Sequence, residues 1–262
     1  MIKTNYHTHT TRCKHAEGLD EEYVLAAIQA GLTEIGFSDH APWPKHPLEH
    51  HSIRMELSEF PDYVQSIKRL QRQYAKKIKI NIGLESEYYP DRMDFMKNLM
   101  NDTPLDYLVF GNHFHHYEAR GRYYGNYGDT QNLLKHYKED SINGLRTGLF
   151  RIFAHPDLFV RSINDWNQEV EEMCREIVLC AKEMNVVLEY NLGGIRNFSH
   201  LEYTYPYDKF WMIVAELKAN IIIGVDAHSP QDLLDMESIK KAEDFLTSIG
   251  VQIMDGLNIP IR

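Results

Sequence analysis

The chain has 262 residues, of which 43% are hydrophobic and 11% aromatic, so it can bury the core of one large domain. Its formal net charge of −10 argues against nucleic-acid binding, because phosphate backbones attract a basic surface. No apolar run approaches the roughly 20 residues that span a bilayer, and the polar start lacks a signal-peptide core, so we expect a cytoplasmic protein without membrane contact.

Short β-rich segments alternate with amphipathic helical segments along the whole chain. Such alternation predicts βα units with parallel strands and right-handed crossovers. Seven units favour an α/β fold, a distorted TIM-like (β/α)7 barrel in a single domain over 1–262, with an open doubly wound sheet as the alternative. In chain order the predicted elements are strand 2–7, helix 20–31, strand 34–39, helix 58–77, strand 78–85, helix 91–100, strand 106–112, helix 130–146, strand 150–155, helix 167–184, strand 186–191, helix 207–220, strand 221–226 and helix 230–250.

The first strand carries two histidines, and a third lies in the turn after it. Side chains of an extended segment repeat with period two, so the rings of His7 and His9 share one face. Two imidazoles on one face suit a divalent metal, although a half-buried pair on an edge strand gives the same pattern. His15 follows in the turn. Cys13 lies among these histidines, but a lone thiol is weak evidence for a ligand and we leave it out of the predicted set.

Two long non-helical stretches, 41–58 and 114–129, both follow predicted strands. Connections of this length in compact domains are usually functional lids or disordered segments. Their histidines could contact a substrate, although solvated loop residues are the more common case; they are His46, His50, His51, His115 and His116.

Every predicted strand ends in at least one side chain that could bind a metal or transfer a proton. Active sites of barrels and open α/β sheets lie at the carboxyl ends of the strands, so this agreement predicts one shared pocket. A zinc ion takes about four ligands, and nine donors would therefore serve two or three ions. Imidazole and carboxylate donors fit zinc, manganese or iron. The predicted metal donors are His7, His9, His15, His40, Glu85, His113, His155, Asp226 and His228.

Several segments resemble the successive metal motifs of the PHP (polymerase and histidinol phosphatase) family. These segments are HTHTTRCKH, SDHAPWP, GLESEYYP, GNHFHHY, AHPDL and VDAHSP. The resemblance covers almost the whole chain and is greatest to the single-domain histidinol-phosphate phosphatases. It implies a distorted barrel of seven βα units around three divalent metal ions.

The resemblance also implies how the donors are shared. The first ion would be bound by His7, His9, Glu85 and Asp226, and the second by Glu85, His113 and His155. The third would be bound by His15, His40 and His228, with Glu85 as a bridge. At the fourth strand we favour His113 over His115, because His113 directly follows the strand.

Clustered divalent ions can generate hydroxide at neutral pH and clamp the oxygens of an in-line displacement. Together with the resemblance, this predicts hydrolysis of L-histidinol phosphate in histidine biosynthesis, by a metal-bridging hydroxide that attacks phosphorus without a covalent phosphoenzyme. Arg161 and Arg196, placed in loops, are expected to bind phosphate, although most arginines are solvated surface residues. The candidates for protonating the leaving group are Asp39, His40 and Asp157, and those for holding the substrate's imidazole and amine are Glu189 and Asn191.

Three alternatives compete with this interpretation. One is a PHP-type phosphoesterase that acts on another small phosphate ester or on a nucleotide. Another is a metal-dependent amidohydrolase, which usually uses a carboxylated lysine or a single bridging carboxylate, whereas no lysine ends a predicted strand here. The last is a metal-storing or regulatory module without catalytic activity.

Overall fold

Seven parallel strands form a nearly closed barrel in the computed structural model, which describes residues 1–44, 53–116 and 121–257. Each hydrogen-bonded neighbour pair is parallel. Between the last strand and the first, a parallel bridge joins Thr8 to Ala227, and the His9 N–H donates to the Ala227 carbonyl at 2.8 Å. The barrel prediction is confirmed, and the open doubly wound sheet is wrong. In barrel order the strands are β1 (Thr4–Asn5), β2 (Glu34–Phe37), β3 (Lys79–Ser86), β4 (Tyr107–Gly111), β7 (Ile152–Ala154), β8 (Val187–Asn191) and β9 (Ile221–Gly224).

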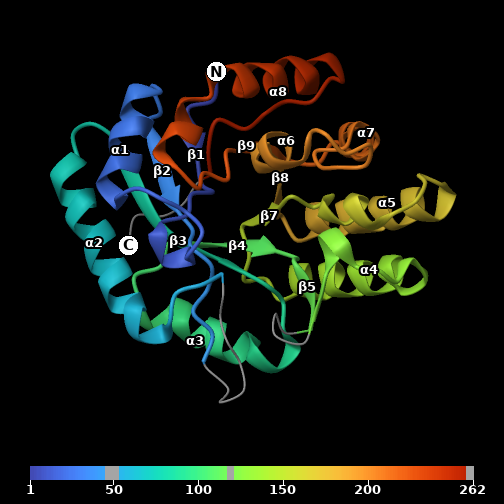
Figure 1. Ribbon diagram of the computed structural model, residues 1–262, viewed down its shortest axis with the longest axis horizontal. Coiled ribbons are helices and arrows are strands. Elements are labelled where there is room, and N and C mark those ends of the chain that lie inside the picture. Colours follow the sequence, from blue (N-terminus) through green and yellow to red (C-terminus); the bar gives the residue numbers. More distant parts are fainter. Residues whose placement is uncertain (45–52, 117–120, 258–262) are drawn as a thin grey trace.

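Helices surround the strands on the outside of the barrel (Figure 1). Most agree with the predicted ranges to within a few residues. The predicted helix 58–77 begins as a 3-10 turn at Leu57–Glu59, and the predicted helix 230–250 divides into a 3-10 turn at Pro230–Leu234 and a separate α-helix. The helices that follow the predicted pattern are α1 (Asp20–Gln29), α2 (Phe60–Tyr74), α3 (Met93–Asp102), α4 (Thr130–Arg146), α5 (Gln168–Glu183), α7 (Asp208–Leu217) and α8 (Met236–Ser248).

Three further elements interrupt the simple alternation. Helix α6 (Leu192–Phe198) follows β8 directly, and the Asn191 side chain caps it by accepting the Gly193 N–H at 2.8 Å. Strands β5 (Phe114–His115) and β6 (Arg122–Tyr123) form an antiparallel pair within 114–129, a stretch that the sequence predicts to be non-helical. Other 3-10 turns lie at Thr11–Cys13, Pro90–Arg92, Tyr124–Asn126 and Leu158–Ser162.

Side chains of the strands alternate between the barrel interior and the layer of helices. In β4, Tyr107 and Val109 belong to the interior cluster, whereas Leu108 and Phe110 pack in the larger core toward the helices. The Tyr107 ring occupies the space beside Gly83, where a Cβ atom would lie 2.5 Å from the ring carbon Cζ. The remaining members of this apolar interior cluster are Tyr6, Ile152, Ala154, Val187, Ile222 and Leu257.

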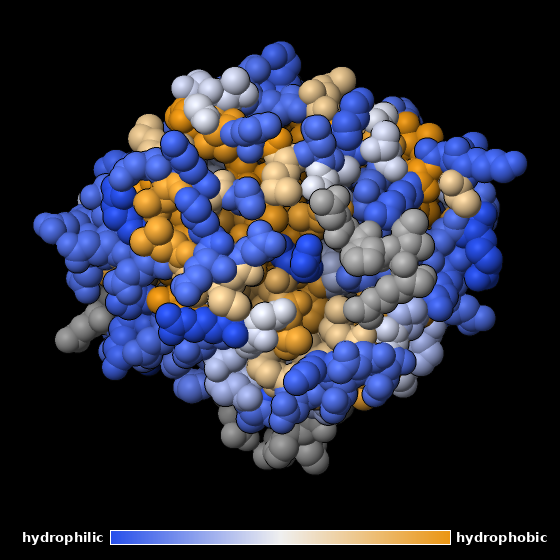
Figure 2. All heavy atoms as spheres, turned by 180° about the vertical axis from the view of Figure 1, so that it is seen from behind, coloured by the Kyte–Doolittle hydropathy of each residue, from blue (hydrophilic) through white to orange (hydrophobic). Residues whose placement is uncertain are grey.

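The surface is largely hydrophilic. Figure 2 shows one face, where hydrophilic residues dominate the periphery and hydrophobic ones appear near the middle. Across the described part of the chain, no helix has both the length and the apolar character needed to cross a membrane.

Candidate metal centre

Toward the carboxyl ends of the strands, the inward-facing residues change from apolar to polar. On β8 the inward residue Val187 is followed two positions later by Glu189, and on β9 Ile222 is followed by Gly224. A Cβ atom on Gly224 would lie only 1.8 Å from Glu189 Oε1, and one on Gly111 only 2.4 Å from Glu85 Oε1. The two glycines therefore leave the space that the two carboxylates occupy.

A cavity of about 530 Å³ opens at these strand ends, a size typical of small-molecule sites. Eight of the nine predicted donors line it, and the ninth, His7, is fully buried among them. The structure thus brings the predicted donors together at one end of the barrel. Among the described residues, the other lining side chains are Ile53, Phe114, Tyr123, Leu158, Asn197, Phe198 and Tyr205.

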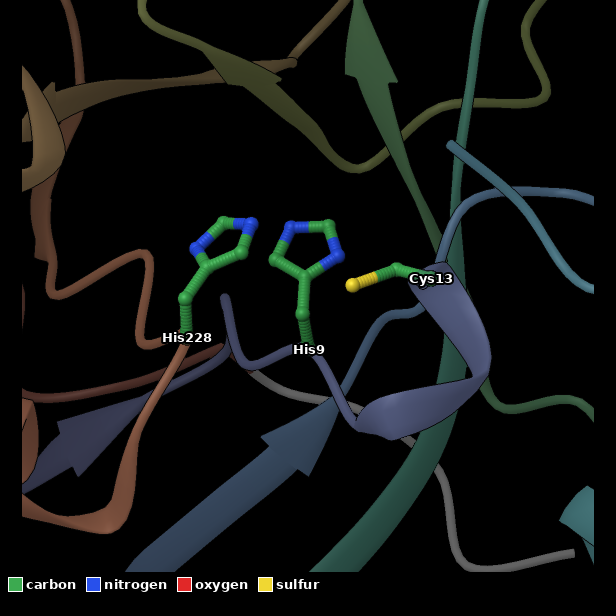
Figure 3. A group of neighbouring side chains, drawn as sticks. All are labelled: His9, Cys13 and His228. Atoms are coloured by element: carbon green, nitrogen blue, oxygen red, sulfur yellow. The ribbon is translucent and has the colours of Figure 1, made fainter. Parts of the chain in front are cut away.

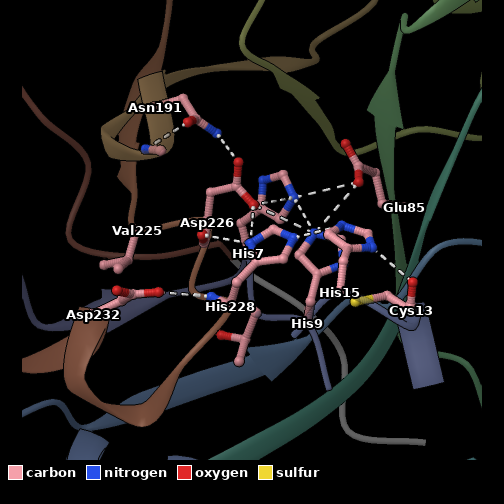
Figure 4. A network of polar contacts seen from close by, with 12 residues as sticks. His7, His9, Cys13, His15, Glu85, Asn191, Val225, Asp226, His228 and Asp232 are labelled. Carbon is pink, nitrogen blue, oxygen red and sulfur yellow. Dashed lines mark hydrogen bonds and ion pairs between the residues drawn. The ribbon is translucent and has the colours of Figure 1, made fainter. Parts of the chain in front are cut away.

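The deepest donors converge on one small volume (Figure 4). Nε2 of His7 and Nε2 of His9 lie 3.0 Å apart. Glu85 Oε2 lies 3.5 Å from each of these nitrogens, and Asp226 Oδ1 lies 3.4 and 3.3 Å from them. Four donors placed tetrahedrally around zinc at 2.0–2.1 Å are separated by about 3.3 Å. The four side chains therefore fit a divalent cation, which would also satisfy the buried Asp226 Oδ1, an atom without a hydrogen-bond partner in the described structure.

A second group shares Glu85 with the first. Nε2 of His113 and Nε2 of His155 each lie 3.2 Å from Glu85 Oε1, the oxygen that faces away from the inner four. The two oxygens of one carboxylate thus face two separate groups of imidazoles. This arrangement suits a carboxylate that bridges two cations.

The outer donors are closer to solvent. His15 Nε2 lies 3.0 Å from His228 Nε2, as Figure 4 shows from close by. His40 is the third predicted member, and its Nδ1 lies 3.1 Å from Glu85 Oε2, while its ring centroid is 5.6 Å from that of His15. The structure therefore places His40 between the outer pair and Glu85.

Cys13 also lies in this region. Its thiol is grouped with ring nitrogens of His9 and His228 within 4.8 Å, and Figure 3 shows the sulfur beside the His9 ring. Burial raises the pKa of the Cys13 thiol to about 12.

The second ring nitrogen of four donors has a partner, which fixes how each ring points. His7 Nδ1 lies 3.0 Å from both Glu189 oxygens, and His113 Nδ1 lies 3.1 Å from Glu87 Oε1. The outer rings use backbone instead: His15 Nδ1 lies 2.6 Å from the Cys13 carbonyl and His228 Nδ1 lies 3.1 Å from the Asp226 carbonyl. In each case the other nitrogen, Nε2, faces the donor cluster.

The strand ends combine shifted pKa values with uncommon backbone angles. Burial disfavours the charged form of Glu85, but the imidazoles of His113 and His7 outweigh it and hold the pKa of the carboxyl well below its usual value. His155 and Asp226 have positive φ angles of 33° and 51°. Such angles are uncommon for residues other than glycine and concentrate at functional sites.

The predicted proton donors occupy different surroundings. His40 lines the cavity, and burial lowers its pKa to about 4. Asp39 lies behind the donors, where Oδ1 accepts the Thr10 N–H at 2.9 Å and comes within 4.0 Å of His9 Nδ1. Burial raises the pKa of Asp39 to about 7.

Asp157 is fully buried and faces helix α7. Its Oδ2 accepts the Tyr207 N–H at 2.7 Å and the Trp211 indole N–H at 3.0 Å. Asp157 is not among the described residues that line the cavity. Its role as a proton donor stays a prediction.

The predicted substrate-binding residues also differ in their contacts. Arg161 stacks on Phe198, with Cζ 3.6 Å from the ring centroid, and its buried Nε has no hydrogen-bond partner in the described structure. Arg196 donates from Nη2 to the carbonyls of Val225 and Asp226 at 2.6 and 2.7 Å, and its buried Nη1 also has no hydrogen-bond partner in the described structure. Both arginines lie in short helices rather than in the loops that the sequence suggested.

Asn191 supports the donors from beside the cavity. Its Nδ2 donates to Glu189 Oε2 at 2.9 Å and to Asp226 Oδ2 at 3.2 Å. Among the loop histidines, His115 contacts Asp140, with Nδ1 2.9 Å from Oδ2, and the ring of His116 lies beside that of His115, with centroids 4.0 Å apart and planes tilted by 42°. His46, His50 and His51 lie outside the described residues.

Sequence reasoning missed the aromatic wall of the cavity. Phe114 and Tyr123 face each other across the β5–β6 pair, whereas Phe198 and Tyr205 come from α6 and the segment after it. The cluster of tyrosines in 114–129 was visible in the sequence, but nothing in its spacing indicated which rings reach the cavity.

The chain is similar in sequence to a known domain family and to several named proteins. A model of the PHP domain matches residues 5–192. The chain is 27% identical over 240 residues to a protein named probable histidinol-phosphatase from Deinococcus radiodurans, covering 87% of this chain and 86% of that protein. It is 24% identical over 264 residues to histidinol-phosphatase from Bacillus subtilis, covering 89% and 96% respectively.

A solved structure shares the fold. Histidinol phosphate phosphatase from Lactococcus lactis, in complex with zinc, L-histidinol and phosphate, superimposes with a TM-score of 0.75. The match covers 97% of this chain and 95% of that one at 22% sequence identity. The barrel architecture is therefore common to both chains.

Proposed function

Because the chain belongs to the PHP domain family, we propose that it is a metal-dependent phosphatase that hydrolyses L-histidinol phosphate to L-histidinol and phosphate. The observation that carries this proposal is the convergence of nine imidazole and carboxylate donors on one cavity. The substrate is inferred from relatives that are named probable histidinol-phosphatase or histidinol-phosphatase and that match this chain over most of their length. Generic phosphate esters and nucleotides are the alternative substrates.

We assign three divalent ions of zinc, manganese or iron to the donors as follows. The inner ion would be held by His7, His9, Glu85 and Asp226, the second by Glu85, His113 and His155, and the outer ion by His15, His40 and His228. Divalent ions held there supply Lewis acidity toward a phosphoryl oxygen and a hydroxide nucleophile at neutral pH. Zinc is the ion named with the Lactococcus lactis enzyme.

The protein's own groups would bind and neutralise the phosphate. Arg161 is suited to this role because its guanidinium has a buried Nε without a partner and stacks on Phe198, a cavity wall. A guanidinium in this setting can bind phosphate oxygens and oppose charge that grows in the transition state. Arg196 would act indirectly, since its bonds to two backbone carbonyls hold the strand end that carries Asp226.

The leaving alkoxide needs a proton. His40 lines the cavity, but it is assigned above to the outer ion and burial lowers its pKa to about 4, so it has no proton to give at neutral pH. Asp39 is bound by Thr10 and Asp157 by α7, so the geometry selects none of the three predicted donors. Asp39 would instead orient the segment of His9. Its Oδ1 accepts the N–H of Thr10, the residue after His9, and lies 4.0 Å from His9 Nδ1.

The proposal is tested by phosphate release from L-histidinol phosphate after the protein is stripped with a chelator and reloaded with zinc, manganese or iron. A panel with a nucleoside monophosphate and a generic aryl phosphate measures selectivity. We expect kcat/KM for histidinol phosphate to exceed the others by roughly tenfold or more. Equal rates on all three esters would contradict the substrate assignment and leave a general phosphatase.

His9→Ala should abolish release, because it removes a donor of the inner group. The matched control is His200→Ala, which removes an exposed imidazole that is not among the residues lining the cavity. A His9→Ala protein with full activity would overturn the ligand assignment.

A further inference from the structure

A charged pair with no role in the proposed reaction lies directly behind the donor cluster. Arg54 is 0% exposed and Glu87 is 1% exposed, and their Nη2 and Oε1 atoms are 2.8 Å apart. Burying two charges costs several kcal/mol of desolvation per ion, so such a pair is a poor device for stability alone. A buried pair of this kind therefore calls for another explanation.

Glu87 connects this pair to a donor. Its Oε1 also lies 3.1 Å from Nδ1 of His113, whose Nε2 lies 3.2 Å from Glu85 Oε1. A carboxylate on the far nitrogen of a ligating imidazole fixes the ring and its tautomer and makes the near nitrogen more basic. The guanidinium of Arg54, with Nη2 2.8 Å from Oε1, places a positive charge beside this carboxylate.

Glu87 could instead be a metal ligand itself, because its carboxylate lies within 4.8 Å of nitrogens of His40 and His113. Its contacts argue otherwise. Oε1 already accepts from Arg54 and faces His113 Nδ1, and Oε2 accepts the Trp43 indole N–H at 3.2 Å. Both oxygens are thus occupied by groups of the protein.

The partners of Glu87 come from the connection between β2 and α2. Trp43 precedes residues 45–52 and Arg54 follows them, and Arg54 also donates from Nη1 to the Ala41 carbonyl at 3.0 Å. The described ends of this connection, 41–44 and 53–55, are therefore anchored to the same carboxylate that orients His113. Glu189, the carboxylate beside His7, binds Asn191 in the described structure.

We propose that Arg54 and Glu87 are positioning residues of the metal centre: Glu87 aims Nε2 of His113 at the second ion, and Arg54 holds Glu87 and couples the described segments 41–44 and 53–55 to occupancy of that ion. This inference rests on the metal binding proposed above and not on the identity of the substrate. Coupling of this kind is reciprocal, so the ion would stabilise these two segments and they would strengthen binding of the ion.

The test uses the full-length protein and the variant R54M/E87M, which replaces both charges by apolar side chains of similar length. Removing one partner alone would leave an unpaired buried charge, whereas replacing both avoids that penalty. R175M/E216M is the matched control, because Arg175 and Glu216 form an exposed pair with N–O distances of 2.7 and 2.6 Å.

Zinc content is measured against a series of competing chelators. We expect R54M/E87M to hold one zinc ion about 10- to 100-fold more weakly than the wild type, with the control unchanged. In hydrogen exchange, zinc should slow exchange in peptides covering 41–44 and 53–55 in the wild type, and this effect should disappear in R54M/E87M. Arg54→Lys keeps the positive charge, so its zinc affinity and its zinc-dependent protection should lie between those of the wild type and of R54M/E87M.

Wild-type chelator midpoints and zinc-dependent protection in R54M/E87M would overturn the proposal. Thermal unfolding of the metal-free proteins separates positioning from folding, since a purely structural role would lower this stability and leave the zinc affinity of the folded protein unchanged. Failure of the proposed activity would appear separately, as zinc-loaded wild-type protein that releases no phosphate from L-histidinol phosphate.

Discussion

The inner and outer ends of the donor cluster are built differently. At the inner end the side chains of His7, His9 and Glu85 are at most 1% exposed, whereas the side chain of His228 at the outer end is 29% exposed. Nδ1 of His7 lies 3.0 Å from the carboxylate of Glu189, whereas the oxygen nearest to Nδ1 of His228 is the Asp226 backbone carbonyl at 3.1 Å. A charged partner makes an imidazole a stronger donor. We therefore expect a tightly held inner ion and a more readily exchanged outer ion.

The largest effect should come from Glu85, which is shared by the inner four donors and by the second group with His113 and His155. Glu85→Ala removes the shared carboxylate and leaves His7, His9 and His113 facing one another. Loss of metal charge stabilisation amounts to several kcal/mol, so kcat/KM should fall by about 1,000-fold or more, since each 1.4 kcal/mol is tenfold. Phosphate release and metal content would be measured together.

Glu202→Ala, which removes an exposed carboxylate, is the control for Glu85→Ala. If the Glu85 variant kept its full metal content, the carboxylate would not be the bridge that unites the inner groups, and the contrast between the two ends would lose its basis.

Metal removal should act on the two ends in order. A weak chelator is expected to remove the outer ion first, because His15 and His228 are more accessible and the atom nearest each Nδ1 is a backbone carbonyl oxygen. His15→Ala should mimic this state, with one ion fewer and an activity loss of roughly 10- to 100-fold. His7→Ala should lose more bound metal and more activity than His15→Ala. Loss of all ions in a single step at one chelator concentration would break the comparison.

A smaller effect is expected from the partner of the inner histidine. Glu189→Gln keeps the shape beside Gly224 but removes the charge that faces His7 Nδ1. The inner ion should then be held about 10-fold more weakly and come closer to the outer ion in affinity. Competition with a fluorescent zinc chelator measures the shift, with the exposed Glu169→Gln as control. An unchanged affinity would mean that burial alone, rather than the carboxylate, distinguishes the two ends.

The sequence was a good guide to the barrel and to the donors for one physical reason. Period-two alternation in parallel strands fixes which residues face inward, and the last inward residues must meet at one end. Alternation cannot separate a donor from its support, however. Glu189 and Asn191 share the inward face of β8 with no local mark of their supporting contacts to His7 and Asp226.

Side chains outside the strands were harder to predict, because tertiary contacts decide them. Helix α6 forms although Gly193 and Gly194 disfavour a helix, and Gly194 is needed there because a Cβ atom would lie 1.9 Å from the Tyr205 carbonyl oxygen. Arg196 lies in the same helix and donates to backbone carbonyls. The pairing of Arg54 with Glu87 spans 33 positions and leaves no periodic pattern.

The smallest effect on activity is expected at Asp157, a strand-end carboxylate that faces away from both ends of the cluster. Its Oδ2 binds the Tyr207 N–H and the Trp211 indole, and burial raises its pKa to about 7. Asp157→Asn keeps an oxygen for those donors, so kcat/KM should change by less than about threefold. A 100-fold loss would instead place Asp157 in proton transfer and extend the functional region behind the strands.

The same variant should change how stability depends on pH. A carboxyl whose pKa is about 7 in the folded protein and about 3.9 when unfolded binds more protons in the folded state between those values. Its stabilising contribution is therefore complete below about pH 4 and is lost as the pH rises through about 7. The free energy of unfolding, measured with urea, should fall over this range by on the order of a few kcal/mol more in the wild type than in Asp157→Asn. Parallel pH profiles would show that the carboxyl is already ionised in the folded protein, in which case Asp157 resembles the cavity-facing Glu85 more than its position suggests.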